Sequence, residues 1–268
     1  RFGLSTFFFP RKPLQEALQE ILDHGVTAVE LVYDAPHFEQ FNDDLIGRLR
    51  TLGKEGVRFS LHAPFMEVNL SGYFKEVRAF SRLVTERAVR FAVRAGCDPV
   101  VIHPGYTFLM NKVKSAEATA RLHMIEALAP VIAFAGEHGV RIGLENLQMP
   151  FFLLHDLRDF PTFKDALPEL GLVLDVGHAY IMKLRARVPD PEGAILDDLQ
   201  AIGVENVIHV HLSNNSGAVD EHGFIKGSID LKRILKWLHD QGYRRRVIIE
   251  STEIDTLGIA RVLEKVRE

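Results

Sequence analysis

Six apolar runs in this sequence each end on a side chain that can coordinate a metal ion. The six terminal residues are His62, His103, Glu145, Asp175, His211 and Glu250. Neighbouring members are 30 to 42 residues apart, which is the length of one strand, one helix and two loops. Polar residues at matching ends of successive parallel strands converge on one face of the sheet, and in a closed barrel that face carries the chemistry. The pattern therefore predicts an architecture and the position of a site within it.

Four of these residues form the first candidate metal site: Glu145, Asp175, His211 and Glu250. A carboxylate at the end of a buried strand is unfavourable unless it is paired or bound to a metal, and three carboxylates close together repel one another. A divalent cation removes both problems, and carboxylate ligands with one imidazole suit Mn²⁺, Mg²⁺, Co²⁺ or Zn²⁺. For each acid taken alone, the alternative is a helix cap or an ion pair with an arginine at the barrel rim.

Five further residues could extend this ligand set: His62, His103, His178, Asp220 and His222. The first two end the third and fourth predicted strands, His178 follows a strand end by three residues, and the last two share a long loop. The simpler interpretation is a rim histidine or a solvated loop. His209 faces the same side of its strand as His211 but one layer deeper, and we interpret it as a core or supporting residue.

The segments between the strand ends alternate regularly between strand and helix. We expect strands at 2–8, 27–32, 57–62, 99–103, 140–145, 170–175, 206–211 and 246–251, and helices at 13–24, 42–53, 74–95, 115–138, 155–166, 191–202, 230–241 and 253–266. Strands that are apolar without alternation indicate a parallel sheet covered on both faces. Eight such units predict a (β/α)8 TIM barrel in one domain over residues 1–268, with a doubly wound open sheet as the alternative. The longest stretches without periodicity, including 178–190 and 212–229, follow strands, where active-site loops belong.

The composition limits the class of protein and its partners. With 47% hydrophobic residues and a net charge of −4, the chain is typical of a soluble globular protein. No run approaches the ~18 apolar residues of a membrane span. The chain opens on a strand-like segment without a signal-peptide pattern, and the single cysteine, Cys97, excludes an internal disulfide, so we expect a cytoplasmic location. The charge balance disfavours nucleic acid as a partner, although bound metal ions would add positive charge that a residue count misses.

Two more groups of residues could contact a substrate. Several phenylalanines near strand ends could form an apolar wall for the face of a sugar, or could simply pack at the barrel mouth: Phe7, Phe8, Phe65, Phe151 and Phe152. Lys226, Gly227 and Ser228 precede a helix that we expect to begin at Asp230. Backbone amides there could bind a phosphate, because TIM barrels often bind phosphate after strands seven and eight. The alternative is a plain turn into the helix.

Seven strings in order resemble one known group of proteins. They are SLHAPF, VIHPG, GLENL, LDVGHA, HVHLSNN, DEHGFIKGSID and IIES, and they span nearly the whole chain. Together they are similar to the xylose-isomerase-like TIM barrel superfamily. That superfamily includes sugar phosphate isomerases and epimerases, and also the endonuclease IV family of abasic-site nucleases.

The resemblance implies two different sites. The epimerase-like pattern implies one divalent ion on Glu145, Asp175, His211 and Glu250, with the two glutamates also acting as acid and base. The endonuclease IV pattern implies three ions held by nine ligands, which fall on His62, His103, Glu145, Asp175, His178, His211, Asp220, His222 and Glu250. All nine residue types are present in this sequence.

The sequence departs from both patterns. The nucleases carry an arginine between the loop aspartate and histidine, where this chain has Glu221, and the stretch after the second strand, VYDAPHFEQF, is acidic and aromatic. The ketose epimerases place an arginine shortly after the strand-seven histidine, where this chain has LSNNSG after His211.

Three functions follow from these patterns. The leading prediction is a sugar or sugar-phosphate isomerase or epimerase that works through a metal-stabilised enediolate, with Glu145 and Glu250 as acid and base. His178, Lys226, Phe7 and Phe65 are the predicted substrate contacts. The alternative is an endonuclease IV-like phosphodiester hydrolase with two or three ions. A barrel that binds a small ligand or metal without turning it over is the third interpretation.

Overall fold

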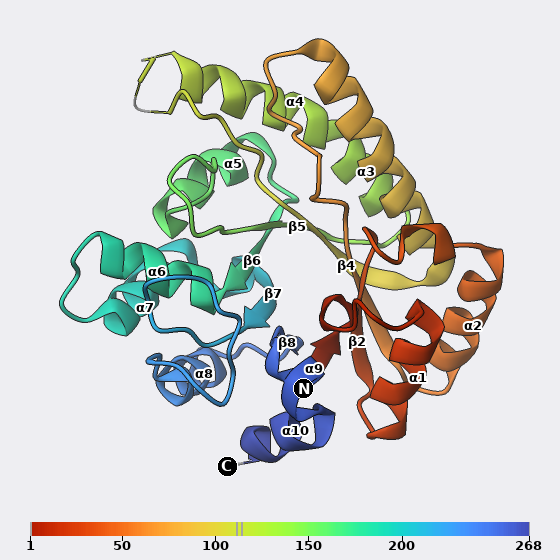
Figure 1. Cartoon of the computed structure of the whole chain (residues 1–268). Helices are drawn as coiled ribbons and strands as arrows, with labels where there is room; N and C mark the ends of the chain where they lie inside the picture. The colour runs from red at the N-terminus through yellow and green to blue at the C-terminus, as the bar shows by residue number, and fades with distance from the viewer. Residues whose placement is uncertain (1, 111, 114, 268) are drawn as a thin grey trace.

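Eight parallel strands close into one barrel in the computed structural model, which describes residues 2–110, 112–113 and 115–267 (Figure 1). The strands are β1 (Phe2–Ser5), β2 (Ala28–Val32), β3 (Arg58–His62), β4 (Cys97–Ile102), β5 (Ile142–Glu145), β6 (Gly171–Asp175), β7 (Val207–Leu212) and β8 (Val247–Ile249). Each strand pairs with its sequence neighbours, and β1 also pairs with β8. This confirms the predicted TIM barrel and excludes the open sheet.

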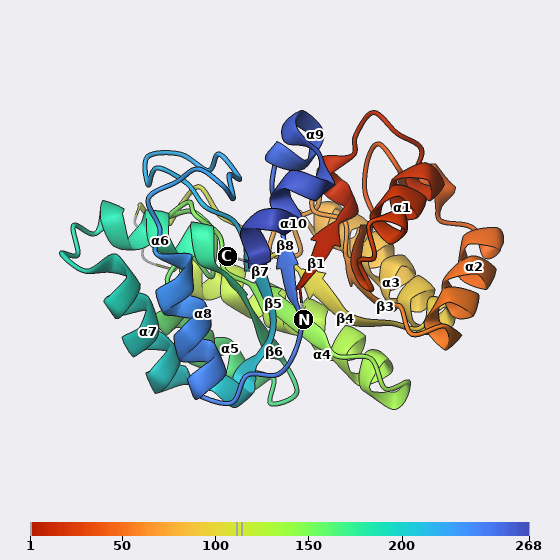
Figure 2. The ribbon, with the colours of Figure 1, turned by 90° about the horizontal axis from the view of Figure 1, so that it is seen from below.

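The helices surround the barrel (Figure 1). They are α1 (Leu14–Asp23), α2 (Asp43–Lys54), α3 (Lys75–Ala95), α4 (Ala116–Glu137), α5 (Phe160–Ala166), α6 (Val176–Arg185), α7 (Pro191–Ile202), α8 (Leu231–Asp240), α9 (Glu253–Leu257) and α10 (Ile259–Arg267). Seen from the side, the long connection from β7 to α8 and the short helix α9 lie on the same side of the barrel (Figure 2). Both follow strands directly, so this side carries the carboxyl ends of the strands.

Helix α6 corrects the prediction that 178–190 is an irregular loop. It begins directly after β6, where the Asp175 carboxylate accepts a hydrogen bond from the His178 amide at 2.7 Å and so caps the helix. Val176, Tyr180 and Ile181 are buried on its inner face. The sequence signal was weak because no turn separates the strand from the helix, and Gly177 lowers the helical propensity of the first turn.

Three other predicted elements have different limits. The strand predicted over 2–8 ends at Ser5, whose hydroxyl accepts a hydrogen bond from the Phe7 amide and caps a 3-10 turn over Thr6–Phe8. The helix predicted over 253–266 divides at Gly258, whose φ of 83° lies in the left-handed region. The helix predicted over 155–166 begins as a 3-10 turn, Leu157–Asp159, before α5.

Among the described residues, helix α4 is the one helix whose length and mean hydropathy reach those of a membrane-crossing helix. No continuous apolar run revealed this, since Arg121 and Glu126 interrupt the segment. In the structure, Met124, Leu128 and Val131 of α4 are buried in the core. This face of the helix packs against the barrel core.

A β-bulge in β7 sets the direction of the histidines that follow it. Leu172 pairs with Val207, but the next residue, Val173, pairs with His209, so Ile208 is the extra residue. The Ile208 side chain occupies the space beside two glycines: a Cβ atom on Gly171 would lie 2.5 Å from it, and one on Gly143 would lie 3.1 Å from it. The bulge thereby brings His211 level with Asp175.

We expect Gly171→Ala to lower the free energy of unfolding by about 1–3 kcal/mol, because the added methyl group overpacks against Ile208. The control is Gly47→Ala in α2, where a Cβ atom would meet nothing within 4 Å. That exposed helical change should raise stability by up to about 1 kcal/mol. Urea denaturation measures both, and a Gly171→Ala protein as stable as wild type would show that the bulge region has room to adjust.

Candidate metal centre

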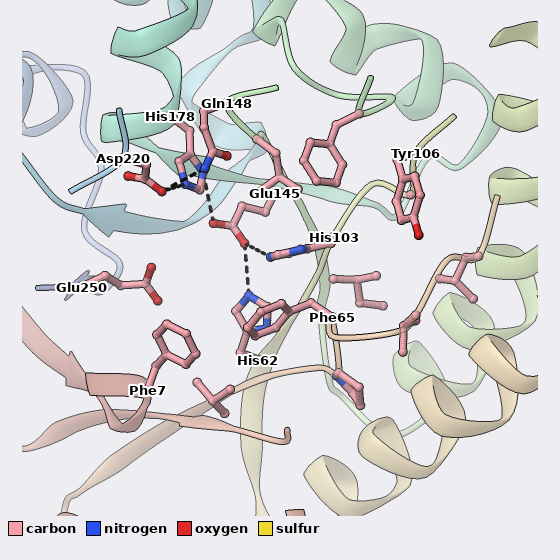
Figure 3. A pocket seen from close by; sticks show the side chains of 18 of the residues that line it. Phe7, His62, Phe65, His103, Tyr106, Glu145, Gln148, His178, Asp220 and Glu250 are labelled. Carbon is pink, nitrogen blue, oxygen red and sulfur yellow. Dashed lines mark hydrogen bonds and ion pairs between the residues drawn. The ribbon is translucent and has the colours of Figure 1, made fainter. Parts of the chain in front are cut away.

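The six predicted strand-end residues gather at the carboxyl ends of the barrel strands. His62, Glu145 and Asp175 are the last residues of β3, β5 and β6, and His211 is the last residue but one of β7. His103 and Glu250 directly follow β4 and β8. All but Asp175 and His211 line a pocket of about 300 Å³ (Figure 3). This volume lies at the lower end of the range for small-molecule sites, ~300–1,000 Å³.

Four of these residues form a compact and buried group: Glu145, Asp175, His211 and Glu250. One ligand atom from each lies within 4.8 Å of the others. The Nδ1 atom of His211 is 3.0 Å from Glu145 Oε1 and 3.7 Å from Glu250 Oε2. Asp175 Oδ2 is buried without a hydrogen-bond partner. A buried acceptor of this kind requires an explanation, and three carboxylates with one imidazole are a donor set that fits a divalent cation.

Two further groups adjoin the first. In one, the Nε2 atoms of His62 and His103 lie 3.2 and 3.3 Å from Glu145 Oε2. In the other, the Nε2 atoms of His178 and His222 lie 3.0 and 2.9 Å from Asp220 Oδ2. Each group again keeps its ligand atoms within 4.8 Å. All nine residues singled out in the sequence therefore lie in three groups, and Glu145 belongs to two of them.

Hydrogen bonds on the far side of two of these rings direct His62 and His178 toward the groups. His62 Nδ1 lies 2.8 Å from the carbonyl of Ala63, and His178 Nδ1 lies 2.9 Å from the carbonyl of Asn146. A ring nitrogen that faces a carbonyl must donate, which leaves Nε2 directed at the site. The same device orients histidine ligands in metal proteins.

Glu30 faces the far side of the His211 ring as an ion-pair partner, and the sequence analysis missed it. Its Oε1 atom lies 2.9 Å from His211 Nε2, and its Oε2 atom accepts a hydrogen bond from His209 Nε2 at 2.9 Å. All three side chains are almost completely buried. The available signal was a single acid inside the apolar run TAVELV, whose position within a buried strand calls for a partner. His209 lies inside the barrel below His211, as the strand alternation predicts.

Burial and neighbouring charges shift the protonation of the cluster. Burial disfavours the ionised form of Glu145, but the charge of His211 and hydrogen bonds from His103, His211 and His62 outweigh it and hold the pKa of Glu145 well below its usual value. Burial raises the pKa of Glu250 to about 7, although His211 opposes the shift. Burial also lowers the pKa of His103 to about 4. Glu145 is therefore ionised at neutral pH, whereas the pKa of Glu250 lies close to neutral pH.

The predicted substrate contacts divide into two sets. Phe7, Phe65 and Phe152 line the pocket, whereas Phe8 packs against the ring of His222 with centroids 5.4 Å apart. Gln148 lines it as well and donates a hydrogen bond to Asp220 at 3.0 Å, a contact that its place in a loop did not reveal. Phe151 packs between Phe108 and Phe152 outside the lining.

The predicted phosphate-binding turn lies away from the pocket. Lys226, Gly227 and Ser228 are exposed and are not among the lining residues. The Ser228 amide donates to the Asn215 carbonyl at 2.8 Å, so it is not free to bind an anion. The segment forms a turn into α8, which Asp230 caps by accepting a hydrogen bond from the Arg233 amide.

A family model, a relative and two solved structures each match this chain over most of its length. A family model described as xylose isomerase-like TIM barrel matches residues 18–266. An uncharacterized protein of Methanocaldococcus jannaschii is 28% identical over 265 residues, which cover 95% of this chain and 84% of the relative. The crystal structure of a D-tagatose 3-epimerase-like protein is 26% identical, covers 99% of both chains and superposes with a TM-score of 0.79. The IOLI protein, crystallised with a zinc atom, shares the fold at 16% identity and a TM-score of 0.79, over 100% of this chain and 95% of its own.

We expect the chelator-treated protein to lose stability as the pH rises from about 6.5 to 10. Burial lowers the pKa of His178, but Asp175 and Asp220 outweigh burial and raise it to about 10, above the ~6.5 of an unfolded histidine. A raised pKa in the folded state adds stability that is fully present below the unfolded value and is lost as the pH passes the folded value. Urea unfolding at pH 6, 8 and 10 should show a steeper decline for wild type than for His178→Gln.

The control is His239→Gln, because the His239 side chain is 74% exposed. This variant should keep the wild-type decline. Equal slopes for wild type and His178→Gln would contradict the assignment of a proton to the His178 ring.

Proposed function

The chain belongs to the xylose isomerase-like TIM barrel family, and from that premise we propose that it is a metal-dependent enzyme that isomerises or epimerises a sugar-like substrate. The observation that carries the proposal is the pairing of Glu145 and Glu250. Their carboxylate oxygens lie within 4.8 Å of each other at the wall of a small-molecule pocket. The likeness to a D-tagatose 3-epimerase-like protein supports this class of reaction.

The group of Glu145, Asp175, His211 and Glu250 would hold one divalent cation, Mn²⁺, Zn²⁺, Mg²⁺ or Co²⁺. When bound, the cation would act as a Lewis acid toward neighbouring substrate oxygens. Asp175 suits this role because its two oxygens have different tasks: Oδ1 caps α6, and Oδ2 is buried without a hydrogen-bond partner.

Glu145 and Glu250 would move the proton. Glu145, held ionised by three histidines, would remove the proton from the carbon next to the carbonyl. Glu250, whose pKa lies near 7, would return a proton. Return to the former carbonyl carbon, with the hydroxyl proton passing to the former carbonyl oxygen, gives isomerisation. Return to the same carbon from the opposite face gives epimerisation. Proton transfer of this kind contributes ~10²–10⁴-fold to the rate.

The remaining lining residues would orient the substrate. His178 lines the pocket, and its Nε2 atom would contact a substrate oxygen in exchange for the Asp220 carboxylate, which lies 3.0 Å away. Phe7 and Phe65 lie edge to face with centroids 5.7 Å apart, and they would cover the apolar face of a sugar ring. Figure 3 shows both rings beside His62 and Glu250.

We expect Glu145→Gln and Glu250→Gln each to lower proton exchange by at least about 100-fold. The assay incubates the zinc- or manganese-loaded protein with ketohexoses in D2O and follows deuterium at the carbon next to the carbonyl by NMR. Substitution removes the carboxylate that accepts or donates the proton.

The matched control is Glu192→Gln. Glu192 is equally buried, but it accepts a hydrogen bond from the Asp230 amide at 3.0 Å in the α7–α8 region. That variant should retain wild-type exchange. Exchange that survives in both site variants would remove the acid–base assignment, and metal binding without exchange on any ketose would favour a binding protein.

A second candidate function is a phosphodiester hydrolase with several metal ions. The observation that favours it is the arrangement of all nine residues in three adjoining groups, more ligands than one ion needs. Two or three ions could activate water and neutralise a leaving oxygen. Against DNA as substrate stand Glu221, between Asp220 and His222, and the net charge of −4.

Metal stoichiometry separates the two candidates. Isothermal titration of chelator-treated protein with zinc should give about one tightly bound ion per chain, and His222→Ala should leave that value unchanged. Two or three ions in wild type, together with cleavage of abasic-site DNA that His222→Ala abolishes, would instead establish the hydrolase.

A further inference from the structure

The pocket has two chemically different ends (Figure 3). One end contains the candidate metal ligands that line the pocket, among them Glu250. Tyr106 lies across the pocket from Glu250 in Figure 3. Tyr106 pairs with the lining residue Phe152, and the loop that carries the lining residues Val68 and Leu70 is hydrogen-bonded to Tyr106 through Asn69. We call Val68, Leu70, Tyr106 and Phe152 the apolar end.

Hydrogen bonds tie together the three loops that form the apolar end. The side chains of Asn69 and Ser71 both donate to the Tyr106 carbonyl, at 3.0 and 3.1 Å. Tyr106 also forms an antiparallel bridge with Phe152, and their ring centroids are 6.0 Å apart. The loops can approach this closely because Gly105 has no side chain: a Cβ atom there would lie 2.6 Å from Ser71 Oγ. The position of the apolar end is therefore fixed by contacts between the three loops.

Among the described residues, no lysine or arginine lines the pocket. Its acidic lining residues are Glu145, Asp220 and Glu250, all at the end that holds the candidate ligands. A phosphate or carboxylate group that reached the apolar end would lose its hydration without gaining a cationic partner, which is strongly unfavourable. An alkyl group there would instead gain from burial against the aromatic rings.

We propose that the substrate is an uncharged polyhydroxy ketone or aldehyde whose far end carries an apolar group, as in a deoxy sugar, and that it is not a sugar phosphate. The inference rests on the proposed function, because that function places the reacting oxygens near Glu145 and Glu250. The rest of a six-carbon chain then extends toward Tyr106.

Ligand binding tests the inference without turnover. Calorimetry on zinc-loaded protein would compare D-fructose, 6-deoxy-D-fructose and D-fructose 6-phosphate. The deoxy ketose should bind a few-fold more tightly than fructose, as burial of one methyl group predicts, and the phosphate should bind at least about 10-fold more weakly. A phosphate ester that binds as tightly as the deoxy ketose, or no binding by any of the three, would overturn the inference.

Two single substitutions test whether the far end of the ligand lies at the apolar end of the pocket. Val68→Arg should tighten binding of D-fructose 6-phosphate and weaken binding of the deoxy ketose. Val77→Arg is the matched control, because Val77 is 39% exposed on α3 and does not line the pocket. An unchanged order of affinities in Val68→Arg would contradict the inference. If the three ligands bind with the expected order of affinities but the protein catalyses no proton exchange, the ligand preference is supported and the proposed function is rejected.

Discussion

Charge compensation among buried carboxylates is the constraint on which this barrel depends. Glu30, Glu145, Asp175 and Glu250 are each at most 7% exposed, and three of them share one group. Two like charges 4 Å apart repel by about 4 kcal/mol at an effective dielectric constant of 20, so three such pairs would approach the whole stability of a typical domain, ~5–15 kcal/mol. Imidazoles from β3, β7 and the loops surround these acids. The imidazoles reduce the repulsion between the buried acids, so the barrel can fold with this cluster at its mouth. The same acids and imidazoles are the groups that would bind a cation.

Glu145 would take part in both candidate functions, because it belongs to two of the three residue groups. One of its oxygens faces His211 and the other faces His62 and His103. A single ion would engage the first oxygen and leave the histidine pair as hydrogen-bond donors. Additional ions would convert the same donors into ligands. The protein side of the site is therefore compatible with two reaction classes. The proposal of a sugar-like substrate draws on the rest of the pocket wall, which has no lysine or arginine among the described residues.

The sequence was sufficient for the barrel and for the six strand-end residues because both depend on spacing. A polar residue at the end of each apolar run can lie in only one place once the strands are parallel and closed. Three features escaped this reasoning. Helix α6 shares Asp175 with β6, so no boundary is visible between them. Glu30 has its partners about 180 residues away. The pocket position of Gln148 and the exposed position of Lys226 depend on loop paths, which no periodicity encodes.

Ile208 shows how a residue remote from the reaction can determine its chemistry. If β7 kept every residue but paired with β6 without the bulge, Val210 would stand level with Asp175 in the place of His211. The imidazole would turn outward among the helices and its acid neighbours would lose their nitrogen donor. Which atoms face a substrate thus depends on the pairing of β7 with β6, and the bulge at Ile208 fixes that pairing well below the barrel mouth.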